Sequence, residues 1–176
     1  TLQARINGYL QLNGNKYPAQ AIHRIDYETS GLVLFCKHPF FQAYCDKNME
    51  EHHIKKDYIA LVQGHTNYKN KKIVSNIARD RHNAKKMIIH PNGKESISIF
   101  NTLKNYKDYS LIQVTILTGR KHQIRVQCAS LKHPILNDSL YGGKRIDNTG
   151  LLLQSHHIQF NDIDVICPQE KRFIRK

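Results

Sequence analysis

Acidic residues are scarce in this chain. Its 176 residues include 14 Asp and Glu against 27 Lys and Arg, a net charge of +13 before any histidine is counted. The few carboxylates form no cluster of the kind that holds a catalytic metal ion, so the sequence does not support a metal-dependent nuclease. A field of positive sign attracts phosphate polyanions, and nucleic acid is therefore the expected partner.

Metal-ligating patterns of cysteine and histidine are also missing. The four cysteines, at positions 36, 45, 128 and 167, are far apart and lack ligand spacing. The eleven histidines include the adjacent pairs His52-His53 and His156-His157, which no Glu or Cys accompanies at ligating spacing. We therefore expect no metal site. Because no secretory segment is present, the cysteines are expected to be reduced core thiols in a cytoplasmic protein.

Long apolar runs, internal repeats and linkers are absent as well. No run approaches the length that crosses a bilayer. Hydrophobic residues make up 40% of the chain and charged residues 23%, which is the balance of a soluble globular protein with a sizeable core. Residues 1–176 are therefore predicted to form one domain, and we expect a monomer.

The stretch His23–Lys37 is the centre of the sequence. Asp26 stands two residues after Arg24, a Thr-Ser-Gly turn follows, and an apolar run then suits a buried strand. Loops held on rigid strands often carry catalytic groups, which makes Asp26 a candidate for chemistry. An Asp before a turn also commonly bonds its own backbone, and this structural alternative stays open.

A second candidate segment is Thr118–Val126. Thr118 is predicted to cap a helix that buries one apolar stripe, made of Ile124, Cys128 and Leu131. Three polar side chains would project from the positive end of this helix: Arg120, His122 and Gln123. Backbone amides and the helix dipole favour an anion there, either the Asp26 carboxylate or an RNA phosphate.

Periodicity and turn signals predict the other elements. Helices are expected over residues 1–11 and after Pro39, with an apolar stripe at Phe41, Tyr44, Cys45, Asn48 and Met49. Strands are expected over 55–64, 95–103, 109–117, 158–160 and 163–167. Basic residues gather at Arg79, Arg81, Lys85 and Lys86, in a segment that either follows RNA phosphates or is a charged hairpin.

These motifs resemble those of the RluA-type pseudouridine synthases. Residues 23–31 match the family's His-Arg-Leu-Asp, two variable residues and Thr-Ser-Gly, with Ile25 for Leu. Residues 118–125 match Thr-Gly-Arg-x-His-Gln-Ile-Arg, and the segment around Tyr58 resembles Lys-x-Tyr-x-Ala-x-Val-x-Gly. Residues 132–142 resemble a further motif of the family, in which Lys132 and Asn137 replace two glycines. Asn tolerates left-handed backbone angles, whereas Lys adopts them less readily.

The resemblance implies an α+β fold: a bent mixed, mostly antiparallel β-sheet with flanking helices and a central basic cleft. It implies conversion of uridine to pseudouridine in structured rRNA or tRNA. The N-glycosidic bond is cut, the uracil turns, and C5 is joined to the same sugar carbon. No metal, nucleotide cofactor or energy source is implied. The competing hypothesis is an RNA-binding protein of the same fold without catalysis.

The resemblance also implies the site residues. Asp26 would be the catalytic carboxylate, whether it attacks C1′, adds to the base or removes a sugar proton to give a glycal. Burial favours a protonated carboxyl group, and Arg120 is the predicted cation that keeps Asp26 charged. Tyr58 would lie against the flipped uracil, with its hydroxyl available for proton transfer, and Arg24 would fill the space that the base vacates. Further RNA or substrate contacts are predicted for Arg79, His122, Gln123 and Arg125, and for Leu152 in an apolar floor over residues 151–153.

The beginning of the chain carries one more expectation. Thr1-Leu2 resembles the Thr-Leu that follows a strand with a Lys-Pro-x-Gly motif in the family. We therefore expect residues 1–176 to be a single catalytic domain that lacks the family's N-terminal strand or strands and any N-terminal RNA-binding domain.

Overall fold

Eight strands form one bent sheet in the structure, a computed structural model that describes residues 1–174. The strand order is β10-β9-β4-β8-β7-β5-β6 with antiparallel neighbours, and β2 pairs with β9 in parallel. The bounds are β2 (Ser30–Gly31), β4 (Lys55–Gln63), β5 (Lys71–Arg79), β6 (Met87–Ile89), β7 (Lys94–Asn105), β8 (Tyr109–Ile116), β9 (Leu153–Phe160) and β10 (Ile163–Ile166). The predicted α+β class and the mixed, mostly antiparallel sheet are confirmed.

Strand β4 is at the centre of this sheet, between β8 and β9. Its residues 58–62 are at most 5% exposed, and they belong to the main hydrophobic core together with Phe100 and Ile112 from neighbouring strands. Full burial of a large apolar side chain contributes roughly 1.5–3 kcal/mol to stability. This buried run therefore holds β4, and with it Tyr58, in a well-defined position.

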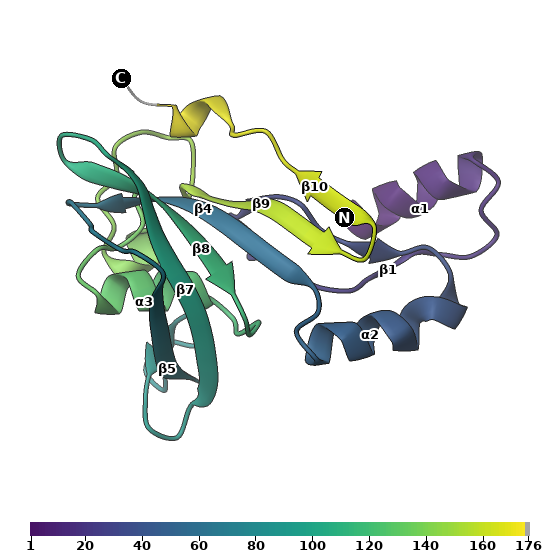
Figure 1. Ribbon diagram of the computed structural model, residues 1–176, viewed down its shortest axis with the longest axis horizontal. Helices are drawn as coiled ribbons and strands as arrows, with labels where there is room; N and C mark the ends of the chain where they lie inside the picture. Colours follow the sequence, from purple (N-terminus) through teal and green to yellow (C-terminus); the bar gives the residue numbers. More distant parts are fainter. Residues whose placement is uncertain (175–176) are drawn as a thin grey trace.

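Two helices lie at one end of the molecule (Figure 1): α1 (Leu2–Leu12) and α2 (Gln42–Glu50). The predicted helix at the start of the chain is confirmed, and the Thr1 hydroxyl accepts a hydrogen bond from the Ala4 amide. Its apolar face is not buried, however, because Leu2 is 52% and Tyr9 66% exposed. Of the stripe predicted for α2, Cys45 is buried, whereas Tyr44 is half exposed.

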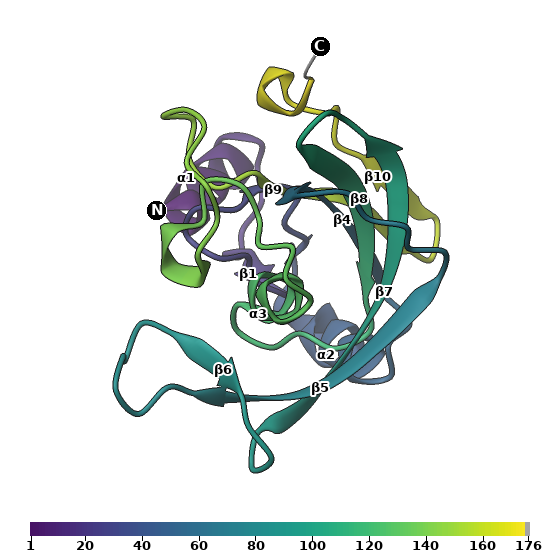
Figure 2. The same cartoon turned by 90° about the vertical axis from the view of Figure 1, so that its left-hand side faces the viewer.

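Helix α3 (Gln123–Ser130) lies inside the curve of the sheet, and Figure 2 shows the strands bending around it. It begins later than predicted. His122 is the residue before its first turn and has a left-handed φ of 55°. Thr118 does not cap the helix, because its hydroxyl accepts from the Ile97 amide and donates to Oε1 of Gln123. The segment before α3 is therefore a loop tied to β7.

The single buried strand predicted after Asp26 is wrong, because the structure has two short strands there. The segment forms β2 and then β3 (Phe35–Cys36), which pairs with β1 (Gln20–Ala21) in a separate two-stranded sheet. Gly31, at φ 100°, explains the change of direction: a Cβ there would lie 2.1 Å from the Ser155 carbonyl oxygen. Only glycine permits this close approach of the Asp26 loop to β9.

Left-handed backbone occurs at the two positions where the related motif has glycine. Lys132 has a φ of 66° and Asn137 a φ of 65°. Asn137 therefore has the left-handed angles that Asn tolerates, and Lys132, which adopts them less readily, has the same conformation directly after α3. All four cysteines are free thiols, three of them buried and Cys167 partly so.

Candidate active site

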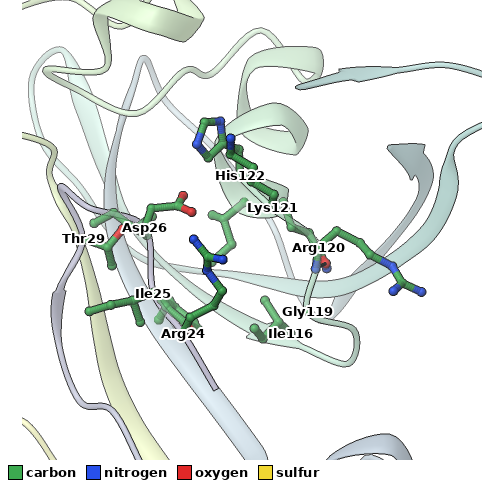
Figure 3. A pocket seen from close by; sticks show the side chains of 13 residues that line it. Arg24, Ile25, Asp26, Thr29, Ile116, Gly119, Arg120, Lys121 and His122 are labelled. Atoms are coloured by element: carbon green, nitrogen blue, oxygen red, sulfur yellow. Dashed lines mark hydrogen bonds between the residues drawn. The ribbon is translucent and has the colours of Figure 1, made fainter. Parts of the chain in front are cut away.

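One pocket of about 140 Å³ brings together the residues that the sequence separates (Figure 3). Asp26 lines it from the loop before β2, Tyr58 from β4, and Arg120 from the loop before α3. Leu153 of β9 and Ile116 of β8 add apolar walls. The pocket is therefore assembled from four separate segments of the chain around the central strand.

Asp26 is held by its backbone and not by its carboxylate. Its carbonyl oxygen accepts from the Thr29 amide at 3.0 Å, which closes a turn, and the Leu32 amide is bonded to Ser155 of β9 at 3.0 Å. Within residues 1–174 the carboxylate accepts no hydrogen bond from another side chain or amide, and the side chain is 21% exposed. Its lone pairs are thus free for a ligand in the pocket.

The cation beside Asp26 is Arg125, which corrects the prediction of Arg120. Nη1 of Arg125 lies 3.9 Å from Oδ2 of Asp26. Nε of Arg120 instead donates to the Glu95 carbonyl oxygen at 2.9 Å, and Figure 3 shows its side chain pointing away from Asp26. The late start of α3 is the cause, because it places Arg125 inside the first turn of the helix and leaves Arg120 in the exposed loop.

Arg125 is itself fixed by a buried carboxylate. Its Nε and Nη2 donate to the two carboxylate oxygens of Asp138 at 2.8 and 2.7 Å. Both residues are buried, so the predicted contact between Arg125 and an RNA phosphate is wrong. A two-pronged pair of this kind holds the guanidinium plane in one orientation. Asp138 was missed in the sequence because its role depends on how the loop that follows α3 folds back onto the helix.

Gln123 is buried, lines the pocket and organises the loop before α3, and its predicted RNA or substrate contact stays a prediction. Its Oε1 accepts from the Arg120 amide at 3.0 Å and from the Thr118 hydroxyl. Its Nε2 donates to Ile97 and Ser98 of β7. All its hydrogen-bonding capacity is used within the protein, and the pocket wall depends on it.

Tyr58 and Leu153 form the inner surface of the pocket. Tyr58 is 5% exposed, and burial raises its pKa to about 12, so the hydroxyl keeps its proton at neutral pH. The predicted pocket residue Leu152 is instead in the main core and fully buried. Neighbouring residues of an extended chain face opposite ways, which is why Leu153 reaches the pocket and Leu152 does not.

His122 and Arg24 also line the pocket. Nδ1 of His122 lies 2.8 Å from the Tyr141 hydroxyl oxygen, and burial lowers the pKa of His122 below its ordinary value. Arg24 is exposed, and in Figure 3 its guanidinium points into the same space as the Asp26 carboxylate. A ligand in the pocket would meet an exposed cation at the rim and a neutral imidazole on the wall.

The basic segment over residues 77–87 is a hairpin made of β5 and β6, as one of the two interpretations predicted. Arg79 is exposed on β5, and its Nε donates to the Ala84 carbonyl oxygen at 3.2 Å. It does not line the pocket. Lys86 lies over the ring of Tyr141, next to His122. The hairpin therefore brings one of its positive charges, Lys86, close to the pocket wall, whereas Arg79 lies outside the pocket.

No group of three or more His, Cys, Asp or Glu is placed to hold a metal ion in the part of the chain that the structure describes. Over the same residues, no helix is long and apolar enough to span a membrane.

Known proteins are similar to this chain in sequence and in fold. Residues 3–130 match the family described as RNA pseudouridylate synthase. The chain is 38% identical over 170 residues to a Bacillus subtilis protein named uncharacterized RNA pseudouridine synthase YhcT, covering 96% of this chain and 55% of that protein. It is 34% identical over 170 residues to ribosomal large subunit pseudouridine synthase D of Borreliella burgdorferi, covering 94% and 51%. The chain thus spans about half the length of these relatives.

A solved structure confirms the fold. Human RNA pseudouridylate synthase domain containing 1 superposes with a TM-score of 0.79 at 24% identity, over 94% of this chain and 75% of that one. The chain belongs to the RNA pseudouridylate synthase family, and the resemblance to its RluA-type members is confirmed by the named relatives.

Proposed function

We propose that this chain is the catalytic part of an RNA pseudouridine synthase that isomerises a uridine in ribosomal RNA. The observation that carries the proposal is the Asp26 carboxylate, which is accessible in the pocket, free of hydrogen bonds within the described residues, and 3.9 Å from a fixed guanidinium. A carboxylate with this access can act on the sugar or the base of a bound nucleotide. The family and its relatives named as ribosomal large subunit enzymes support this reaction and substrate.

The residues divide the reaction among them. Asp26 acts as the charged carboxylate, and Arg125, itself oriented by Asp138, favours that charge. Tyr58 and Leu153 enclose the uracil, because a flat base packs on an aromatic ring and an apolar wall. The Tyr58 hydroxyl, which stays protonated, serves as a hydrogen-bond or proton donor. Arg120 stabilises the loop before α3 through its contact with Glu95, and its part in the chemistry is indirect.

The uridine must leave the RNA stack to reach this pocket, at a cost of a few kcal/mol. Arg24 is exposed at the rim and fills the vacated space, since a guanidinium can stack on bases and bind phosphate together. The reaction itself breaks the bond from N1 to C1′ and forms the bond from C5 to C1′; C5 loses one proton and N1 gains one. Atoms and charge balance without any further reactant.

The test is conversion of uridine to pseudouridine by the purified chain, measured by position in large-subunit ribosomal RNA. The substrate is RNA from a strain in which the gene for this protein is deleted. RNA from the wild-type strain is the reference. We expect the purified chain to form pseudouridine at one or a few positions. Before this treatment, the RNA of the deleted strain should carry uridine at the same positions. RNA binding without any conversion would favour the binding protein over the enzyme.

A further inference from the structure

A second cavity, of about 530 Å³, adjoins the Asp26 pocket. Both are lined by Arg24, Tyr58, Ile116, Gly119 and Arg120, so they form two parts of one depression. The rest of its wall includes the C-terminal end of α2, Glu95 of β7 and the segment at Ile22–His23, together with Lys56 of β4. The mechanism proposed above gives this larger cavity no role.

Lys56 is a buried charge without an anionic partner. It is 6% exposed, and its Nζ contacts the Sδ of Met49 at 2.8 Å. Among the described residues it forms no ion pair, whereas its neighbour Lys55 lies 3.4 Å from the Asp57 carboxylate. A thioether is a weak acceptor, so the Lys56 ammonium has N–H donors that no strong acceptor satisfies. Buried ammonium groups are ordinarily paired, because desolvation is costly.

The groups around Lys56 do not supply the missing anion. The Leu34 amide donates to Nε2 of His23 at 3.0 Å, and burial together with the charge of Lys56 lowers the pKa of His23 to about 4, so this ring is neutral. Two carboxylates on the wall, Glu50 and Glu95, are exposed, and neither pairs with Lys56. Burial in turn lowers the pKa of Lys56 to about 8.

The geometry of β4 relates this site to the pocket. Lys56 and Tyr58 are two residues apart on one strand, so they face the same side and lie about 6.5 Å apart along it. Tyr58 lines both cavities, and Lys56 lines the larger one only. Resting on the proposed function, we infer that Lys56 is the centre of an anion subsite that binds a backbone phosphate of the RNA next to the nucleotide held in the Asp26 pocket.

The first experiment compares RNA binding by Lys56→Met and by the matched control Lys55→Met. Methionine retains the length of the buried side chain and removes its charge. We expect Lys56→Met to raise the Kd roughly 10-fold, the size of a lost charged hydrogen bond, and to reduce the slope of log K against log salt by about 0.7–0.9. The exposed Lys55 should give a change under about 2-fold. Equal Kd and slope for the two variants would overturn the subsite.

The second experiment is carried out first on the unaltered chain, so its main result does not depend on how Lys56→Met folds. RNA oligonucleotides with one uncharged methylphosphonate linkage at successive positions are bound to the unaltered chain. We expect one linkage beside the target uridine to weaken binding, and this loss should disappear in Lys56→Met. The inference is overturned if no linkage beside the uridine matters. Both readouts are binding constants, so a chain that binds in this way without forming pseudouridine would refute the proposed function and leave the subsite standing.

Discussion

Asp26 lines the pocket together with Tyr58, Asp57 precedes Tyr58 on β4, and the surroundings of the two carboxylates are opposite. The Asp57 side chain is 2% exposed and receives the Thr115 hydroxyl at 2.5 Å and His157 Nδ1 at 2.9 Å, with Lys55 at 3.4 Å. The Asp26 side chain is 21% exposed, and its nearest cation is 3.9 Å away. A carboxylate with both oxygens hydrogen-bonded within the protein holds the fold, whereas one left unsatisfied in a pocket is available for a substrate.

The largest expected effect comes from Asp26→Asn. The variant keeps the shape and removes the charge, so conversion of uridine should fall by roughly 10⁴-fold or more while RNA binding is retained. Glu28→Gln is the matched control, because Glu28 is a half-exposed carboxylate 3.8 Å from the same Arg125. Its conversion rate should stay within about 2-fold. Unchanged turnover by Asp26→Asn, measured as pseudouridine formed per minute, would remove Asp26 from the chemistry.

Arg125→Met tests the link between the pocket and the buried interior. It leaves the Asp138 carboxylate buried without its partner, which should lower the free energy of unfolding by about 3–5 kcal/mol. The measurement is urea denaturation, with the exposed Lys121→Met as control at under about 0.5 kcal/mol. If Arg125→Met instead lost activity with an unchanged free energy of unfolding, this arginine would act on the reaction and not on the stability of the fold.

Asp57→Asn should reduce stability by about 1–3 kcal/mol, because buried donors lose their charged acceptor, and should leave turnover unchanged in the folded protein. Although burial opposes it, hydrogen bonds from Thr115 and His157 hold the pKa of Asp57 below 3.8. The stabilisation is therefore present above pH 3.8 and is lost as the pH falls through the lower folded value. Unfolding curves at acid pH that coincide for the variant and the unaltered chain would contradict this account.

The smallest effect is expected for His157→Gln. The hydrogen bond to Asp57 raises the pKa of His157 above 6.5, and its other ring nitrogen lies 2.8 Å from Asp164. The stabilisation from protonated His157, which bridges Asp57 and Asp164, is fully present below pH 6.5. It is lost as the pH rises through the higher pKa that His157 has in the folded protein. Stability should therefore decline over that range, by less than about 1 kcal/mol because Asp164 is exposed. His157→Gln should remove this decline, and the exposed His82→Gln should retain it.

Much of the site was predictable from local sequence. Strands β4, β7 and β8 follow from their strand-forming residues between turn signals, and the helix at residues 1–11 follows from the spacing of its apolar residues. Asp26 before a turn and Tyr58 within a strand were identified from the motifs that contain them. These features depend on residues close together in the chain, where propensity and turn chemistry decide the outcome.

Only the tertiary structure decided which residues reach Asp26. The start of α3 depends on Gln123 bonding to Ile97, 26 residues away, and this shift of the helix brings Arg125 and not Arg120 to the carboxylate. The pairing of β9 with β4 likewise places Leu153 in the pocket and Leu152 in the core. A change of one residue in helix start or strand register redirects every side chain, and both are fixed by contacts between distant segments, which no local pattern contains.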